Sequence, residues 1–347
     1  MKILNKICLI LIIIGQSSVD ANFYGVVNVV QKAGFHFTGI SRAALALGYT
    51  LRKCHQIASF PDAGSEVFDF CKSRCEKQNV DIQNLKVKID ESDGTIIEVV
   101  GRQSIVFSAT NYNELQQALK NPQDEVSRQV ILIYAFLVDH EIGHIKSNDA
   151  VKRNAFLVGS NLLVYAGSHY VMNHTSLKTW FKPATNFKEF IISAIAFGCV
   201  KPLFAANDYV YSLYAQDQET AADYNAIKYA DNPESLRLAA SYFEKLDESY
   251  INVLCGTQEI NPSFSWIVKA QFENVRKILE TQYQSQKITE DFRAWVKKQT
   301  KYLNLVRSIA DQEHPSGIVR GKAIRAAADK LEADQLGSNV SEVVCLN

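Results

Sequence analysis

The sequence predicts an α+β fold that is mostly helical, with a small, mostly antiparallel sheet ahead of one buried helix. Residues 85–89 alternate between apolar and charged side chains, which is the pattern of a half-buried strand. Val130–Val138 is apolar without interruption and favours a buried helix. Amphipathic segments occupy most of residues 233–336, so the second half of the chain is predicted to be helical.

The composition is that of an ordinary globular protein and gives no support for a nucleic-acid partner. Of the 347 residues, 47% are hydrophobic and 21% are charged, and the formal net charge is zero. A nucleic-acid-binding domain would carry a basic excess. The length allows a sizeable core in one large domain or two smaller ones.

The first residues have the features of a secretory signal. Lys2 and Lys6 precede the apolar run Ile7–Ile14, and Val19-Asp20-Ala21 is a small-residue cleavage pattern. The alternative is a membrane anchor, which is weaker because the run is too short to cross hydrocarbon. Residues 1–21 are therefore predicted to be removed during export to a periplasmic or secreted location.

Export would place the cysteines in an oxidising compartment, where some should form disulfides. The plausible pairs are Cys54 with Cys71 or Cys75, and Cys255 with Cys345. No second Cys or His pair lies near Cys71 and Cys75, which argues against a structural zinc site there.

The chain before residue 109 is predicted to hold helices and then the sheet. Residues 22–64 form an N-terminal helical segment, and Ser65–Lys77 is a further helix at the start of the core, which spans 65–232. Asp93-Gly94 is a hairpin turn signal. The predicted strands are Leu85–Ile89, Thr95–Val100 and Ser104–Phe107. An edge strand of this sheet could pair with an extended peptide.

The buried helix is predicted to start near Asn121. Asn121 is a good N-cap, Pro122 suits the first helical position, and Asp124 and Glu125 favour the first turn. The helix carries the sequence His-Glu-Ile-Gly-His at residues 140–144.

This pentapeptide predicts a metal site. Residues four apart on a helix lie one turn above each other, so His140 and His144 can direct two imidazoles at one ion. Neutral imidazoles suit zinc, and Glu141 can accept a proton from water. The pattern could also arise by chance on a core helix, and two histidines alone would bind a metal weakly. A third protein ligand is needed.

The segment Gln218–Asp223 supplies that ligand. On a helix Glu219 and Asp223 share a face, so Glu219 can bind the metal while Asp223 accepts a hydrogen bond from a ligating imidazole. Ala221 and Ala222 would let this helix approach the first one closely. Taken alone, the segment is also compatible with the acidic first turn of a surface helix.

Two apolar segments separate the candidate ligands. Residues 154–177 carry no charge, and the shorter run 190–200 ends at Lys201-Pro202. A single crossing would put the ligands on opposite sides of a bilayer, so either both segments cross or neither does. Polar residues in the first and the short length of the second favour a buried or membrane-dipping hairpin at 154–206 over two spans.

Residues 233–347 are predicted to be a helical part that packs on the core. Its helices are Glu234–Asn252, Trp266–Tyr283, Glu290–Asp311 and Val319–Leu331.

Three motifs in this order resemble a known family. His-Glu-Ile-Gly-His followed by Glu-x-x-Ala-Asp at 219–223 resembles the HtpX and CAAX prenyl protease family of gluzincin metallopeptidases, in its exported or periplasmic type. His314-Pro315, four residues and Arg320 match the family's H-P-x4-R pattern. The similarity covers roughly residues 65–330, although an Asn-Ala-x-Ala stretch common in the family is absent from 95–100.

The resemblance implies a zincin-like fold and a zinc-dependent endopeptidase acting on envelope or other extracytoplasmic proteins. One Zn²⁺ per chain would be held by His140, His144 and Glu219. Glu141 would take a proton from water and pass it to the leaving amine, while Asp223 orients a ligand histidine.

The roles of two further residues stay open. His314 or Arg320 could stabilise the oxyanion or gate the cleft; equally, His314 could begin a helix and Arg320 form an ion pair. Two other readings of the whole chain are a membrane-embedded peptidase and a non-catalytic, chaperone-like binding protein.

Overall fold

The computed structural model has two compact units. One consists of residues 1–52 and 153–211, and the other of residues 53–152 and 212–347. The residues that the structure describes are 44, 47–48, 51–52, 55–91, 97–174, 201–255, 266–285, 292–299 and 314–344. The predicted signal, the Asp93-Gly94 turn, the run 190–200 and most of 22–54 lie outside them.

The described residues are mostly helical with a small sheet, as predicted. The sheet belongs to the second unit and is mixed rather than mostly antiparallel. Strand β3 (Ser104–Ser108) lies in the centre, parallel to β1 (Lys86–Asp90) and antiparallel to β2 (Ile97–Val100). The order follows from burial: β3 holds Ile105, Val106 and Phe107, all fully buried, and the centre is where a strand is covered best. The tight hairpin joins β2 to β3 through Gly101, whose φ of +67° suits glycine.

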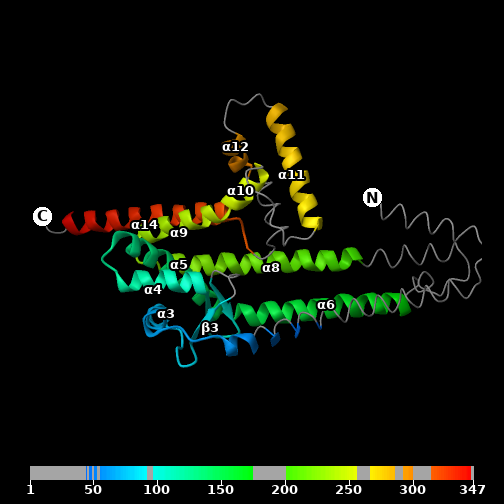
Figure 1. The fold of residues 1–347 in the computed structure, drawn as a ribbon, viewed down its shortest axis with the longest axis horizontal. Coiled ribbons are helices and arrows are strands. Elements are labelled where there is room, and N and C mark those ends of the chain that lie inside the picture. The colour runs from blue at the N-terminus through cyan, green and yellow to red at the C-terminus, as the bar shows by residue number, and fades with distance from the viewer. Residues whose placement is uncertain are drawn as a thin grey trace, which may run out of the picture. The chain divides into compact units, whose positions relative to one another are not determined.

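Three helices of the second unit pack together next to this sheet (Figure 1). They are α3 (Ser65–Lys77), α4 (Ala109–Lys120) and α5 (Glu125–Ser147). The first matches the predicted helix, whereas α4 was not predicted. Its N-cap is Ser108, whose side chain accepts a hydrogen bond from the Asn111 amide.

Helix α5 starts later than the sequence suggested. Asp124 is its N-cap and accepts a hydrogen bond from the Ser127 amide at 2.9 Å. Asn121 instead is the C-cap of α4, which corrects the predicted start. From Tyr134 to Ile145 every residue of α5 is buried, so the helix passes through the middle of the core. Core residues around it include Val67, Phe107, Leu115, Leu236, Phe243 and Ile324.

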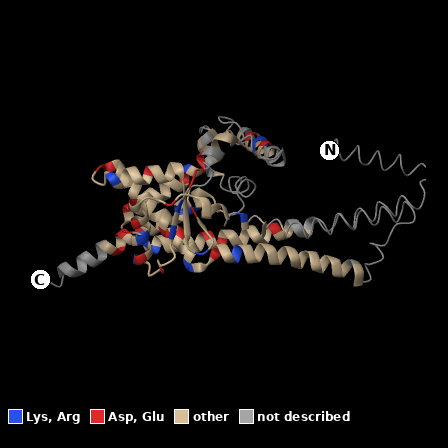
Figure 2. Cartoon of the chain, turned by 60° about the horizontal axis from the view of Figure 1, so that its bottom comes forward, with Lys and Arg blue, Asp and Glu red and all other residues tan. Residues whose placement is uncertain are grey.

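The predicted apolar hairpin at 154–206 overlaps most of helix α6 (Asp149–His174) and the first residues of helix α8 (Lys201–Lys228), and residues 175–200 lie outside the described part of the chain. In the first unit, Phe156 of α6 packs against Tyr211 of α8, with ring centroids 6.2 Å apart. Charged side chains on α6 occur only near its start (Figure 2). Leu163 is 75% exposed and Tyr209 is 66% exposed. Among the described residues, no helix combines the length and the apolar character that a membrane crossing requires.

The C-terminal helices are α9 (Pro233–Leu246), α10 (Glu248–Leu254), α11 (Trp266–Ser285), α12 (Phe292–Lys298) and α14 (Gly317–Val344). The predicted helix 234–252 is thus divided at Asp247, and the part of 290–311 beyond residue 299 lies outside the described residues. Helices α9 and α14 run side by side (Figure 1). Helices α10, α11 and α12 share a second, smaller apolar cluster with Phe272, Leu279 and Trp295.

Asp247 joins the end of α9 to the beginning of α14. Its Oδ2 accepts hydrogen bonds from Ser316 Oγ at 2.7 Å and from the Ile318 amide at 3.0 Å. A Cβ at Gly317 would lie 2.0 Å from the carbonyl oxygen of Phe243, so only glycine allows this approach. The first turn of α14 is therefore fixed against α9.

The two cysteines of α3 are buried. Cys71 and Cys75 are free thiols on the core side of the helix. Their predicted partner Cys54, and Cys345, the predicted partner of Cys255, lie outside the described residues.

Candidate metal centre

Helix α5 presents the pentapeptide inside the second unit. His140, Glu141 and His144 are 5%, 8% and 7% exposed, respectively. The two imidazoles lie one turn apart with their Nε2 atoms 3.2 Å from each other. This is the arrangement that the four-residue spacing predicts.

Helix α8 brings the acidic segment to the same place. Glu219 is 1% exposed and Asp223 is 8% exposed. The two helices approach closely at Gly143, where a Cβ would lie 3.0 Å from Ala222 Cα and 3.1 Å from Asn225 Cβ. Small residues at this crossing let the carboxylate of Glu219 reach the imidazoles.

His140, His144 and Glu219 form a possible metal-binding group. Glu219 Oε2 lies 3.2 Å from His140 Nε2, and Glu219 Oε1 lies 3.2 Å from His144 Nε2. One ligand atom from each residue falls within 4.8 Å of the others, and all three side chains are buried. Two imidazoles and a carboxylate are a donor set that zinc accepts.

Each imidazole has a carboxylate on its other nitrogen. His140 Nδ1 lies 2.9 Å from Asp223 Oδ1, and His144 Nδ1 lies 2.9 Å from Asp149 Oδ2. A carboxylate there keeps a proton on Nδ1, which leaves the Nε2 lone pair for a metal. The residues present therefore fit a cation between the two Nε2 atoms and Glu219.

Asp149 was missed by the sequence reasoning. It lies in the first turn of α6 and is 3% exposed. The chain turns back at Asn148, which has a left-handed φ of 54° and caps α5. One sequence signal could have identified Asp149. Asparagine often ends a helix in the left-handed conformation, so an aspartate directly after Asn148 can turn back toward the helix that carries the His-Glu-Ile-Gly-His sequence.

Arg320 of α14 is part of the site through Asp223. Its Nε donates to Asp223 Oδ2 at 2.8 Å and its Nη2 donates to Asp223 Oδ1 at 2.6 Å. The guanidinium lies over the Phe243 ring, 3.8 Å from the centroid. Arg320 is 7% exposed, so this is a buried bidentate ion pair.

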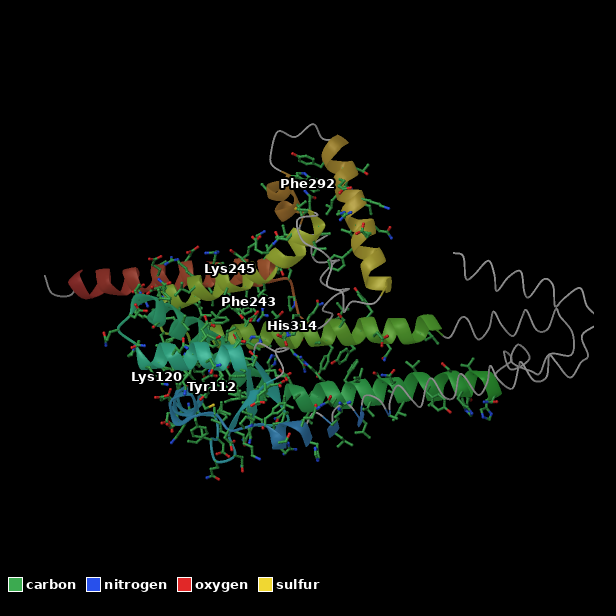
Figure 3. All side chains as sticks on the ribbon, viewed as in Figure 1. Tyr112, Lys120, Phe243, Lys245, Phe292 and His314 are labelled. Carbon is green, nitrogen blue, oxygen red and sulfur yellow. The ribbon has the colours of Figure 1, made fainter. Side chains whose placement is uncertain are left out.

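His314, labelled in Figure 3, precedes α14 and is more exposed than the other predicted site residues, which are buried. Its Nε2 lies 3.6 Å from Glu219 Oε2, and its side chain is 40% exposed. His314 thus lies at the rim of the metal-binding group, while Arg320 is connected to the group through Asp223. The structure brings all the predicted site residues into one place.

The electrostatics of the site favour positive charge between the imidazoles. Burial lowers the pKa of His144, but hydrogen bonds to Asp149 and Glu219 outweigh this and raise it to about 10. The pKa of His140 is raised in the same way by Asp223 and Glu219 against the effect of burial. The carboxylates would stabilise a bound cation as they stabilise these protons.

The acidic groups differ in their protonation. Burial raises the pKa of Glu219, but the neighbouring imidazoles hold it well below its ordinary value. Burial also raises the pKa of Glu141, and in this case the shift remains upward. The Glu219 side chain is therefore anionic, whereas Glu141 is a carboxylate of increased basicity beside it.

A family model described as peptidase family M48 matches residues 134–328, which is more than half of the chain. The matched residues include α5 from Tyr134 onward, α8 and the segment from His314 to Arg320. No curated protein and no solved structure matches the chain.

Proposed function

The chain belongs to peptidase family M48, a family of zinc metallopeptidases, and from this premise we propose that it is a zinc-dependent endopeptidase. The observation that carries the proposal is the buried group of His140, His144 and Glu219, with ligand atoms within 4.8 Å of one another. These residues would hold one Zn²⁺. When bound, zinc supplies a Lewis acid that makes water nucleophilic at neutral pH.

Glu141 is the proposed general base. Its carboxylate accepts a proton from the water whose oxygen attacks the carbonyl carbon of the substrate, and then gives this proton to the nitrogen of the leaving amine as the C–N bond breaks. The upward pKa of Glu141, caused by burial, brings its basicity closer to neutral pH. Glu141 should therefore affect the rate more than metal binding.

The surrounding residues would orient the ligands and bind the substrate. Asp223 and Asp149 hold the proton on Nδ1 of His140 and His144, respectively, and Arg320 fixes Asp223 from behind. His314, at the exposed rim, is suited to donate a hydrogen bond to the carbonyl oxygen as negative charge develops on it.

An extended peptide is the substrate that suits the sheet. Strand β2 is at the end of the strand order in the sheet of the described residues, and it packs against α5. Glu98 of β2 is close enough to contribute to the pKa of Glu141. A peptide that added to β2 would therefore pass close to Glu141.

We further propose that the substrates are envelope or other extracytoplasmic proteins. The support is the signal-like sequence at residues 1–21. The part of α6 from residue 154 onward carries no Asp, Glu, Lys or Arg and exposes Leu163 by 75%, which supports peripheral association of the apolar hairpin with a membrane. A carbonate wash of membranes should release the protein; retention in the membrane would instead indicate an embedded peptidase.

The function is tested by bound zinc per chain, together with cleavage of casein, in wild type, Glu141→Gln and Glu219→Ala. Near-stoichiometric zinc is expected in wild type and Glu141→Gln, with loss in Glu219→Ala and cleavage by wild type only. Zinc that is absent from wild type, or fully kept by Glu219→Ala, would contradict the ligand set. Zinc binding without cleavage by wild type would favour the non-catalytic binding protein.

A further inference from the structure

Helix α3 contacts α5 and the chain just past the end of α8 through one buried arginine. Arg74 Nε donates to Asp139 Oδ1 at 2.9 Å, and Arg74 Nη2 donates to Asp139 Oδ2. Asp139 is fully buried on α5 and directly precedes His140. Arg74 Nη2 also donates to the carbonyl oxygen of Tyr229, just past the end of α8, at 3.1 Å. Arg74 is itself 8% exposed.

Two amides complete this contact. Gln78 Nε2 donates to Asp139 Oδ1 at 2.8 Å, and Asn225 Nδ2 donates to Gln78 Oε1 at 2.8 Å. Asn225 Nδ2 also donates to the main-chain carbonyl of Asp139 at 2.8 Å. Asn225 lies on α8, two residues after Asp223. The group Arg74, Gln78, Asp139 and Asn225, here called the α3 clamp, therefore ties α5 to α8 directly and through α3.

The clamp limits the rotation of α5 about its own axis, and such a rotation would displace the imidazole of His140. Asp139 and His140 point about 100° apart around α5, because successive helical residues do. Side-chain atoms lie roughly 5–6 Å from a helix axis, so a rotation of about 10° would move an imidazole nitrogen by about 1 Å. Metal–ligand distances tolerate only about 0.2 Å. An anchor at Asp139 thus limits the movement of His140.

Stability alone does not account for the clamp. Replacing a buried ion pair by apolar side chains of similar volume is often neutral or stabilising. Arg74 and Gln78 also lie before residue 134, outside the part of the chain that the family model matches. Asp139 and Asn225 lie inside the matched part, so the clamp joins that part of the chain to helix α3.

We propose that Arg74 and Asn225 are positioning residues of the metal site, which hold α5 and α8 in the register that brings His140, His144 and Glu219 together. The proposal rests on the proposed function, because it assumes a metal at these residues. Loss of the clamp should loosen the ligand geometry and weaken zinc binding by about 10- to 100-fold, the range seen when supporting residues of metal ligands are removed.

The test uses the full chain with Glu141→Gln, which prevents self-cleavage, as the parent. The first variant, Arg74→Met with Asp139→Leu, replaces the ion pair by an apolar pair and leaves no buried charge. The control is Arg128→Met with Glu234→Leu, a pair that ties α5 to α9 but is 44% exposed on both sides. The second variant, Asn225→Leu, removes the bonds to Gln78 and Asp139 without changing any charge.

Three quantities are measured in each protein: the Kd for zinc by competition with a chromophoric chelator, the visible spectrum of the Co²⁺-loaded protein, and the free energy of unfolding without metal. The proposal expects weaker zinc binding and an altered Co²⁺ spectrum in the clamp variants, with the control like the parent. Asn225→Leu gives the decisive result if the double variant does not fold.

The proposal is overturned if folded clamp variants bind zinc as the parent does. It is also overturned if zinc affinity falls only in step with the unfolding free energy while the Co²⁺ spectrum at saturation stays unchanged, since this would mean a structural role. A parent that binds no zinc would contradict the proposed function itself, and that result is distinct from both.

Discussion

His144 and Asp149 share a hydrogen bond of 2.9 Å between Nδ1 and Oδ2, although they belong to different helices. The turn at Asn148 brings the first turn of α6 back to the last turns of α5. Together with the bond from His140 to Asp223, it gives both ligand imidazoles the same kind of partner. The metal site is therefore oriented from two sides, by α6 and by α8.

Replacing Asp149 by alanine should weaken zinc binding about 10- to 100-fold, because the His144 ring loses the acceptor that fixes its tautomer. The measurement is the Kd for zinc by chelator competition. Asp217→Ala is the matched control, since Asp217 is an exposed aspartate on α8. Equal affinities in the two variants would show that Asp149 does not orient the ligand.

Replacing Gly143 by alanine should separate α5 from α8, because the new Cβ would lie 3.0 Å from Ala222 Cα. We expect a loss of about 1–3 kcal/mol in unfolding free energy, the usual cost of overpacking, and weaker zinc binding. Urea unfolding and zinc titration measure both. Gly159→Ala on α6 has nothing within 4 Å and should instead stabilise the chain by about 0.5–1 kcal/mol.

Replacing Arg320 by methionine should be much more harmful than the same change at Arg325. Arg320→Met leaves the buried carboxylate of Asp223 without its cation, which typically costs about 3–5 kcal/mol. Arg325 pairs with Glu244, but its side chain is 41% exposed, so its loss should cost at most about 1 kcal/mol. Urea unfolding of the metal-free proteins makes the comparison. Similar losses in both variants would contradict the assigned importance of the buried pair.

The thiols of α3 should be unreactive in the folded protein. Burial raises the pKa of Cys75 to about 12 and raises the pKa of Cys71 further, so neither is a thiolate at pH 8. Labelling by a thiol reagent, located by mass spectrometry, should reach them only after unfolding. Rapid labelling of either residue in the native protein would be inconsistent with this environment.

The same pKa shift predicts a pH dependence of stability. In the unfolded chain the thiols ionise near 9.0, whereas Cys75 in the folded chain stays protonated until about 12. The folded state then holds more protons, so the free energy of unfolding should fall as pH rises from about 9 to 12. In Cys75→Ala the free energy of unfolding should fall less over this pH range. An equal fall in the variant and the wild type would show that other groups cause the pH dependence.

The residues of the possible metal-binding group could be predicted from sequence because the spacing within each motif is local, while the family resemblance linked the two motifs. His140 and His144 are one turn apart on any helix, and so are Glu219 and Asp223. Asp149 and Arg74 could not be predicted in this way. The first depends on a turn in the left-handed conformation at Asn148, and the second acts on Asp139 across 65 residues of sequence.

The sheet and the start of α5 show two other limits. Alternation identified β1, and the Asp93-Gly94 turn signal led to the prediction of β2 and β3. Neither signal says which strand takes the centre, and burial of Ile105 and Phe107 decides that. Asn121 and Asp124 are both good caps, and the residues around them do not tell which one begins α5. The prediction failed there because Asn121 instead ends α4.

The junction at Asp247 also separates the segment between α9 and α14 from the site. Its carboxylate holds Ser316 and Ile318, so the chain leaves α9 and returns to α14 at nearly the same point. A change in the length of the segment between them would therefore leave the contact of Arg320 with Asp223 in place.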